Sequence, residues 1–282
     1  MTGEAEAVGR PAVEKAHGQD VRPGPPDTAM RLRRGINFAH VRHPFFSASR
    51  ALVFAHRGGA ALARENTIAA FDNGLALGAD GLELDVHLSR DGIVVVHHDR
   101  TLDRTTSLRG PIADRTADEL ARADVPALAG VLARYRDARI IIEMKVNRPE
   151  LAAAIIDAVR CADAVERVCL GAFGLRVLRA ARALEPRIAT SASREEVRWA
   201  LYRSWCRWPV RSVGYAGYQV PEVAERTRVV SPRFVEHAHR AGLGVQVWTV
   251  DAAADARRLL GWGVDALITD RPDIIVPLVA SR

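Results

Sequence analysis

Short apolar runs alternate with longer amphipathic segments from residue 51 to the end of the chain. The short runs are rich in Val, Ile and Leu, which is typical of strands buried on both faces. The longer segments repeat apolar residues three and four positions apart, which predicts helices. The expected strands are 51–56, 81–87, 138–144, 167–173, 187–192, 244–250 and 265–270, with a weaker one at 217–223 or 226–230. Strands separated by helices predict an α/β fold, a TIM-type (β/α)8 barrel.

The apolar run at 93–98 does not fit this alternation, because only four residues separate it from the second strand. A parallel partner would need a crossover of about a dozen residues or more. Asp91-Gly92 is also typical of a two-residue hairpin turn. We therefore predict an antiparallel hairpin in which Asp85 lies opposite His98, followed by a small insertion after the second strand at about 99–125.

The first fifty residues differ in composition from the rest. Residues 1–30 are rich in Gly, Pro and charge, which predicts a flexible N-terminal tail. Residues 31–50 form a basic lead-in segment, either a helix or a lid on the barrel. The barrel domain is expected to span 51–282.

The net charge of +6 favours phosphate-bearing partners, but the arginines are scattered through the chain. No nucleic-acid-binding motif accompanies them, so we expect no nucleic acid partner. The cysteines form no CxxC, no apolar run approaches the ~20 residues of a bilayer span, and no secretory signal is visible. These features predict a cytoplasmic protein.

An aromatic and basic stretch at 198–211 qualifies that prediction. It combines three tryptophans with four arginines. This mixture suits peripheral contact with a membrane, and it equally suits a barrel helix packed through its aromatic residues. Both interpretations are open at this level.

Polar residues end several of the predicted strands, and barrel enzymes carry their sites at those carboxyl ends. The three acids Glu83, Asp85 and Glu143 would repel one another, and a hard divalent cation, Mg²⁺ or Ca²⁺, would offset the repulsion. The alternative is that each acid pairs with an arginine. His56 and His98 flank the acids as a general acid and base, with His87 and His97 as weaker candidates. Arg57 and Lys145 suit contact with phosphate, whereas the position of Glu65 suggests a helix cap.

Several motifs resemble the glycerophosphodiester phosphodiesterase family in the same order along the chain. They are VFAHRGG (53–59), the run from Glu65 to Thr106, IIIEMK (140–145), VQVWTVD (245–251) and DALITDRPD (265–273). The resemblance implies a metal-dependent barrel that hydrolyses glycerophosphodiesters, small-molecule substrates, to an alcohol and glycerol phosphate. It also implies roles in substrate binding for Glu65 and Trp248.

Two other functions are open at this stage. One is a lysophospholipase D-type activity on lysophospholipids, which would use the same residues. The other is a non-catalytic barrel that binds phosphate or lipid. The oligomeric state is not predicted.

Overall fold

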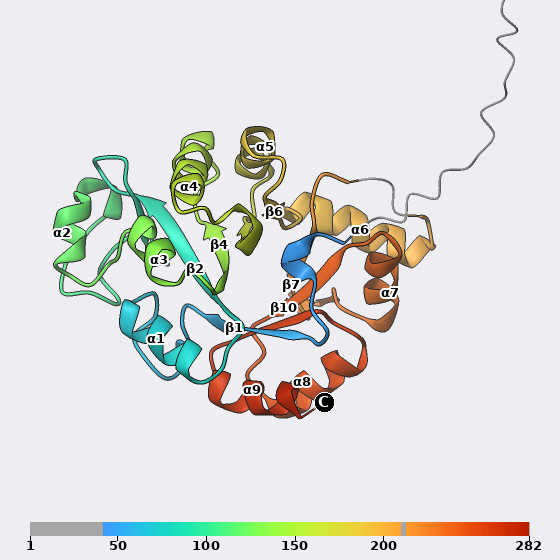
Figure 1. The fold of residues 1–282 in the computed structure, drawn as a ribbon. Coiled ribbons are helices and arrows are strands. Elements are labelled where there is room, and N and C mark those ends of the chain that lie inside the picture. The colour runs from blue at the N-terminus through green and yellow to red at the C-terminus, as the bar shows by residue number, and fades with distance from the viewer. Residues whose placement is uncertain (1–41, 210–212, 282) are drawn as a thin grey trace, which may run out of the picture. The chain divides into compact units, whose positions relative to one another are not determined.

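Eight parallel strands form a nearly closed barrel surrounded by helices (Figure 1). The computed structural model describes residues 42–209 and 213–281. In order around the barrel the strands are β6 (Ala189–Thr190), β5 (Val168–Gly171), β4 (Arg139–Met144), β2 (Gly81–Leu88), β1 (Leu52–His56), β11 (Ala266–Thr269), β10 (Gly244–Trp248) and β7 (Gly217–Pro221). A bridge between Ser191 and Gly217 joins β6 to β7. The predicted TIM-type fold is confirmed, and the weak eighth strand lies at the first of its two predicted positions.

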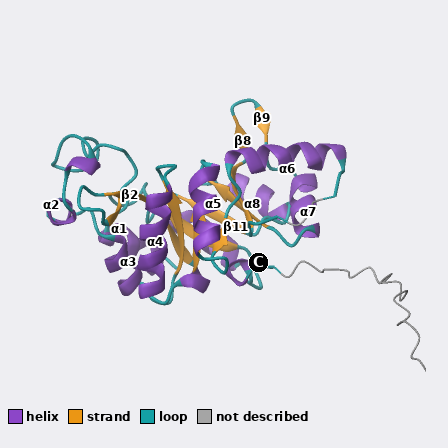
Figure 2. Cartoon of the chain, turned by 90° about the horizontal axis from the view of Figure 1, so that it is seen from above, coloured by secondary structure: helices purple, strands orange, loops and turns teal. Residues whose placement is uncertain are grey.

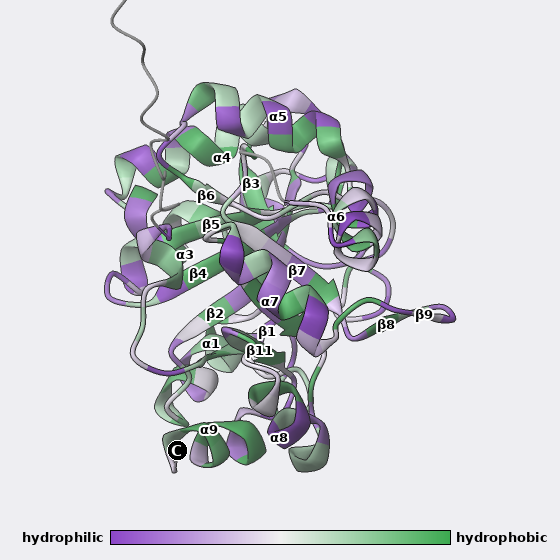
Figure 3. Cartoon of the chain, turned by 90° about the vertical axis from the view of Figure 1, so that its right-hand side faces the viewer, coloured by the Kyte–Doolittle hydropathy of each residue, from purple (hydrophilic) through white to green (hydrophobic). Residues whose placement is uncertain are grey.

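Helices cover the outside of the barrel because alternate strand residues point outward. Leu82, Leu84 and Val86 of β2 are fully buried in the apolar layer between strands and helices. Figure 3 shows hydrophobic and hydrophilic segments alternating along α4 and α5, as expected of helices that pack one face on the barrel. The surrounding helices are α1 (Ile68–Ala76), α3 (Leu128–Arg134), α4 (Pro149–Cys161), α5 (Leu175–Leu184), α6 (Arg194–Cys206), α7 (Pro232–Arg240), α8 (Ala253–Gly261) and α9 (Pro272–Ala280).

The predicted hairpin is present, but its register differs from the prediction by one residue. Strand β3 (Val94–Val96) pairs antiparallel with β2, and Val86 faces Val96. The Ser89 N–H donates to the Ile93 carbonyl at 2.9 Å, and Gly92 has a φ of 78°. The loop therefore contains three residues, a form in which glycine takes the left-handed position. As a result His97, rather than His98, lies opposite Asp85.

The insertion after β3 folds as a small unit on the barrel. It contains the 3-10 turn η2 (Ile112–Asp114) and the short helix α2 (Ala117–Ala121). A capping box between Thr116 and Glu119 begins α2. The insertion has its own apolar cluster, formed by Val95, Leu102, Ile112, Leu120 and Val125.

Two phenylalanines fill the amino end of the barrel. Phe45 and Phe46 lie in the 3-10 turn η1 (Pro44–Phe46) and are almost fully buried. A Cβ added to Gly244 would lie 2.4 Å from the Phe46 ring, so that strand position must stay small. The described end of the predicted 31–50 segment, from residue 42 onward, thus contributes a 3-10 turn that plugs the amino end of the barrel. The predicted tail, 1–30, lies outside the described residues.

A short hairpin marks the carboxyl end of the barrel. The small hairpin of β8 (Val223–Ala224) and β9 (Thr227–Arg228) follows β7 and projects from the body, on the same side as the insertion (Figure 2). Among the described residues, no helix is both long enough and apolar enough to cross a membrane.

Candidate active site

Three acidic side chains converge at the carboxyl ends of β2 and β4. Glu83 and Asp85 project into the barrel because the residues between them, such as Leu84, pack outward. Asp85 pairs in register with Glu143 of β4. One oxygen from each of the three carboxylates lies within 4.8 Å of the others. The predicted convergence of the three acids is present.

The cations of the protein offset this negative charge unevenly. Lys145 Nζ lies 3.3 Å from Asp85 Oδ1 and 3.3 Å from Glu143 Oε1, and Arg57 Nε lies 3.2 Å from Asp85 Oδ2. Glu83 has neither cation as an ion-pair partner, although it accepts a hydrogen bond from the Arg57 N–H at 3.2 Å. Burial, and then repulsion from Asp85, raise the pKa of Glu83 to about 8. The cluster is therefore short of positive charge at Glu83.

A divalent cation fits this donor set. The three residues offer carboxylate oxygens alone, which hard ions such as Mg²⁺ and Ca²⁺ prefer over softer metals. Burial and the neighbouring Asp85 also raise the pKa of Glu143, despite the attraction of Lys145. A bound cation would lower both pKa values and offset the repulsion.

His56, at the end of β1, is held between two acids. Its Nδ1 lies 2.7 Å from Asp270 Oδ1, and its Nε2 lies 3.8 Å from Glu83 Oε2. Burial opposes the charged form of His56, but Glu83 and Asp270 outweigh it and raise the pKa to about 9. Asp270 follows β11 and was not selected from the sequence. The sequence does offer Asp270 as a candidate, because this residue is polar and ends the predicted strand 265–270.

His98 forms a second histidine–aspartate pair beyond the β2–β3 ladder. Its Nδ1 lies 2.6 Å from Asp99 Oδ1. The two weaker candidates point elsewhere. His87 Nε2 contacts the carbonyl of His98, and His97 Nε2 contacts the carbonyl of Thr101. Burial lowers the pKa of both, which suits neutral rings that organise the loop.

Glu65 belongs to an ion-pair network and is not a helix cap. Thr67 caps α1, and its side chain accepts from the Ala70 N–H. Glu65 accepts from Arg57 Nη1 at 3.1 Å and from both Nη atoms of Arg104, at 3.0 and 2.6 Å. Arg104 Nε also donates to Asp99 at 2.6 Å. Arg104, which sequence reasoning did not single out, thus links the insertion to both sides of the cluster.

Asn66 is a further residue that sequence reasoning left without a role. It is buried, its φ is 58°, and its Nδ2 donates to Asp85 Oδ2 at 2.9 Å. Asparagine tolerates this left-handed conformation better than most residues. Asn66 therefore orients one of the three acids.

Trp248 ends β10, on the same side of the barrel as the acids. It is half-buried, and its ring packs edge-on against Phe173 at 6.2 Å between centroids. The pair forms an apolar wall at the carboxyl end of the barrel.

The fold and this cluster together define a (β/α)8 barrel with an acidic cluster at the carboxyl ends of its strands, the end at which barrel enzymes carry their sites. A model of the "Glycerophosphoryl diester phosphodiesterase family" matches residues 56–274. The chain belongs to this family of phosphoric diester hydrolases.

Relatives and solved structures agree with this assignment. The chain is 31% identical to a glycerophosphodiester phosphodiesterase of Caldanaerobacter subterraneus subsp. tengcongensis, over 81% of this chain and 97% of the relative. It resembles the crystal structure of a glycerophosphodiester phosphodiesterase from Agrobacterium tumefaciens with a TM-score of 0.67 and 28% identity, over 80% of this chain and 99% of the other. An Oleispira antarctica phosphodiesterase, solved in complex with the product sn-glycerol-3-phosphate, has a TM-score of 0.67 and 26% identity, over 82% and 97% of the two chains.

Proposed function

We propose that this chain hydrolyses glycerophosphodiesters to an alcohol and glycerol phosphate with the help of Mg²⁺ or Ca²⁺. The observation that carries the proposal is the convergence of three carboxylates within 4.8 Å, beside His56 and its partner Asp270. The Oleispira antarctica relative, solved with sn-glycerol-3-phosphate as its product, supports the same product here.

In this proposal Glu83, Asp85 and Glu143 hold the cation, which would supply positive charge against the phosphate oxygens. Arg57 and Lys145 contact the same phosphate group from the protein side. Both already lie against the acid cluster, so they are positioned next to any phosphate bound there.

His56 and His98 exchange the protons of the reaction. In each ring a carboxylate lies against Nδ1, at 2.7 Å for Asp270 and 2.6 Å for Asp99. The carboxylate fixes the orientation of the ring and leaves Nε2 as the atom that gives or takes a proton. One ring activates the nucleophile, and the other protonates the leaving oxygen. Glu65 keeps Arg57 in place, and Trp248 lines the substrate pocket.

The test is turnover of glycerophosphocholine by purified protein in Mg²⁺ or Ca²⁺, and then in excess chelator. We expect turnover with the ion and loss of turnover in chelator, and we expect both Glu83→Ala and His98→Ala to abolish it. Lysophosphatidylcholine serves as the comparison substrate. Preference for it would favour the lysophospholipase D-type reaction, and turnover of neither substrate would favour the non-catalytic barrel.

We also propose that residues 198–211 contact a membrane surface. The support is the outer face of α6 and the turn after it, where Trp199, Tyr202, Trp205 and Trp208 are all exposed. Indole and phenol rings favour the interface between lipid and water. Residues 210 and 211 lie outside the described residues.

A further inference from the structure

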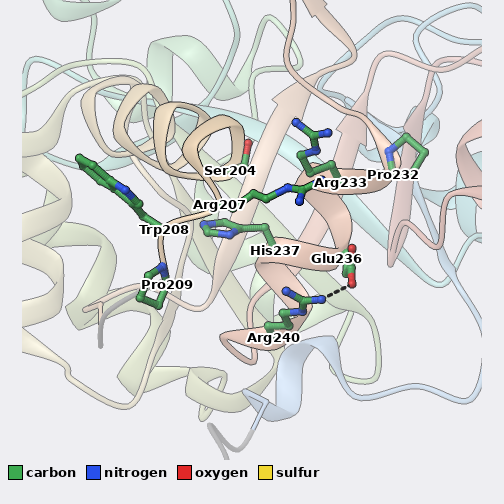
Figure 4. Close-up of a pocket in the computed structure, with 9 residues that line it drawn as sticks. All are labelled: Ser204, Arg207, Trp208, Pro209, Pro232, Arg233, Glu236, His237 and Arg240. Carbon is green, nitrogen blue, oxygen red and sulfur yellow. Dashed lines mark hydrogen bonds and ion pairs between the residues drawn. The ribbon is translucent and has the colours of Figure 1, made fainter.

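A hollow of about 590 Å³ lies between the end of α6 and one face of α7 (Figure 4). Arg207 and Trp208, which follow α6, line one side of it. Arg233, His237 and Arg240 of α7 line the other. None of these residues belongs to the acid and histidine cluster, so the hollow is a separate site.

Positive charge dominates the hollow. Among the described residues, the one acid that lines it, Glu236, is paired with Arg240. Neither Arg207 nor Arg233 has an ion-pair partner within residues 42–209 and 213–281. Figure 4 shows the Arg207 side chain extending across the hollow toward Arg233, with the His237 ring beside it. Two unpaired guanidinium groups that share a hollow favour an anion with several oxygens, such as a phosphate.

The environment of His237 points the same way. Its Nε2 is buried and has no hydrogen-bond partner among the described residues. Burial, and after it the charges of Arg203 and Arg240, lower the pKa of His237. The charges of these two arginines therefore add to burial in disfavouring the charged form of His237.

The backbone at Arg207 is unusual for an arginine. Arg207 ends α6 with a φ of 56°, in the left-handed conformation that glycine usually adopts at the end of a helix. Glycine would fit this position with less strain. An arginine there directs a guanidinium into the hollow at a small cost in stability.

A row of aromatic side chains borders the hollow. Tyr202 packs edge-on against Trp199 on one side and against Trp208 on the other, with ring centroids 6.3 and 5.8 Å apart. Trp199 is 64% exposed and Trp208 is 54% exposed. Figures 2 and 3 place α6 on the side of the barrel from which the β8–β9 hairpin projects, beyond the carboxyl end of β7. The aromatic row therefore lies on the side of the barrel that carries the acid cluster.

We propose that the hollow between α6 and α7 binds the phosphate group of an anionic phospholipid while the aromatic row rests among the headgroups. This proposal rests on the membrane contact proposed for 198–211 and adds a specific lipid site to it. Exposed indoles beside arginines suit the boundary of a bilayer, where the rings enter the headgroup layer and the cations meet phosphate. The rings pack against one another instead of standing apart as platforms for bases, which favours a lipid surface over single-stranded nucleic acid.

The experiment measures binding of the full chain to vesicles of phosphatidylcholine with and without phosphatidylglycerol. The test variants are Arg207→Gln, Arg233→Gln and Arg207→Gly. The last should be at least as stable as wild type, so that loss of binding cannot be attributed to misfolding. Arg136→Gln is the matched control, because Arg136 is an exposed arginine before β4, at the amino end of the barrel. Each variant is also assayed for turnover of glycerophosphocholine, which is soluble.

We expect wild type and Arg136→Gln to bind the anionic vesicles, and each variant at position 207 or 233 to bind about fivefold less tightly. Glycerophosphocholine turnover should be unchanged in all of them. An equal loss of vesicle affinity in Arg136→Gln would show that binding depends only on the overall positive charge, and it would overturn the proposal. Undiminished binding by the Arg207 and Arg233 variants would overturn it as well, as would preference for a single-stranded oligonucleotide over vesicles. Vesicle binding without any phosphodiesterase activity would refute the proposed reaction and leave the lipid site standing.

Discussion

Replacing Glu83 with glutamine should stabilise the protein in chelator, although it removes a proposed ligand. In the absence of a cation, Glu83 faces two carboxylates at no more than 4.8 Å. At an effective dielectric of about 20, each of these contacts costs about 3 kcal/mol. The substitution also removes the attraction of His56 at 3.8 Å, which is worth about 4 kcal/mol on the same scale. These pairwise charges alone leave about 2 kcal/mol in favour of the variant, and relief from burying an ionised carboxylate adds to this figure, so the unfolding midpoint should rise by at least about 4–8 °C for a chain of this size.

The stability that Glu83→Gln gains over the wild type in chelator should increase as the pH rises. The pKa of Glu83 is raised from 4.5 to about 8, so folding of the cation-free wild type takes up a proton at this site. The stability of the wild type therefore falls as the pH rises from 4.5 to about 8, and Glu83→Gln is free of this loss. The two proteins should have similar midpoints at pH 4.5, and the difference should be complete at pH 9.

Thermal unfolding in excess chelator measures the difference in midpoint between the two proteins. The same scan with Mg²⁺ or Ca²⁺ measures how strongly each protein binds the cation. A cation at a hundred times its Kd should stabilise the wild type by about 2.7 kcal/mol and Glu83→Gln by much less. Glu150→Gln, which removes an exposed acid, should behave like wild type. A lower midpoint for Glu83→Gln in chelator at pH 9 would refute the charge balance, and an undiminished response to the cation would remove Glu83 from the site.

Three further substitutions test other parts of the structure. Phe46→Ala should destabilise the barrel by about 3–5 kcal/mol in denaturant titrations and leave the turnover of the folded fraction unchanged, because the plug lies at the opposite end from the site. Asn66→Ala should lower the free energy of unfolding by about 2 kcal/mol and impair turnover. Asn66→Gly relieves the strain of the backbone but still cannot hold Asp85, so it should restore stability without restoring activity. Arg104→Gln should lower kcat/KM or cation affinity by about 10–100-fold with little change in unfolding midpoint. An effect on the midpoint alone would give Arg104 a purely structural role.

The barrel could be predicted because each of its strands is an apolar run separated from the next by a helical pattern. The register of the hairpin could not be predicted, because it depends on side-chain hydrogen bonds within the loop. Ser89 Oγ donates to Asp91 and accepts from the Ile93 N–H, which favours a three-residue loop over the two-residue turn that Asp91-Gly92 suggests. A shift of one position exchanges the two faces of a strand. This is why His97 took the place expected for His98.

The site was predictable to the extent that its residues end strands. Glu83, Asp85 and Glu143 follow from strand alternation and from the shared carboxyl end of the barrel. Asn66 and Arg104 do not, because their roles depend on how a loop and the insertion fold back over the strands. Arg104 reaches Glu65 across 39 positions of sequence, and no local pattern encodes such a contact.

The hydrogen bond between His56 and Asp270 joins the first barrel strand to the end of the last, across 214 positions of sequence. A chain still being synthesised cannot orient this imidazole through Asp270 until the final strand has emerged and docked beside the first. Partially translated chains and fragments cut before β11 would therefore lack the carboxylate that holds His56, one of the two histidines proposed to transfer protons. The chemistry proposed for His56 therefore requires the last barrel strand as well as the first.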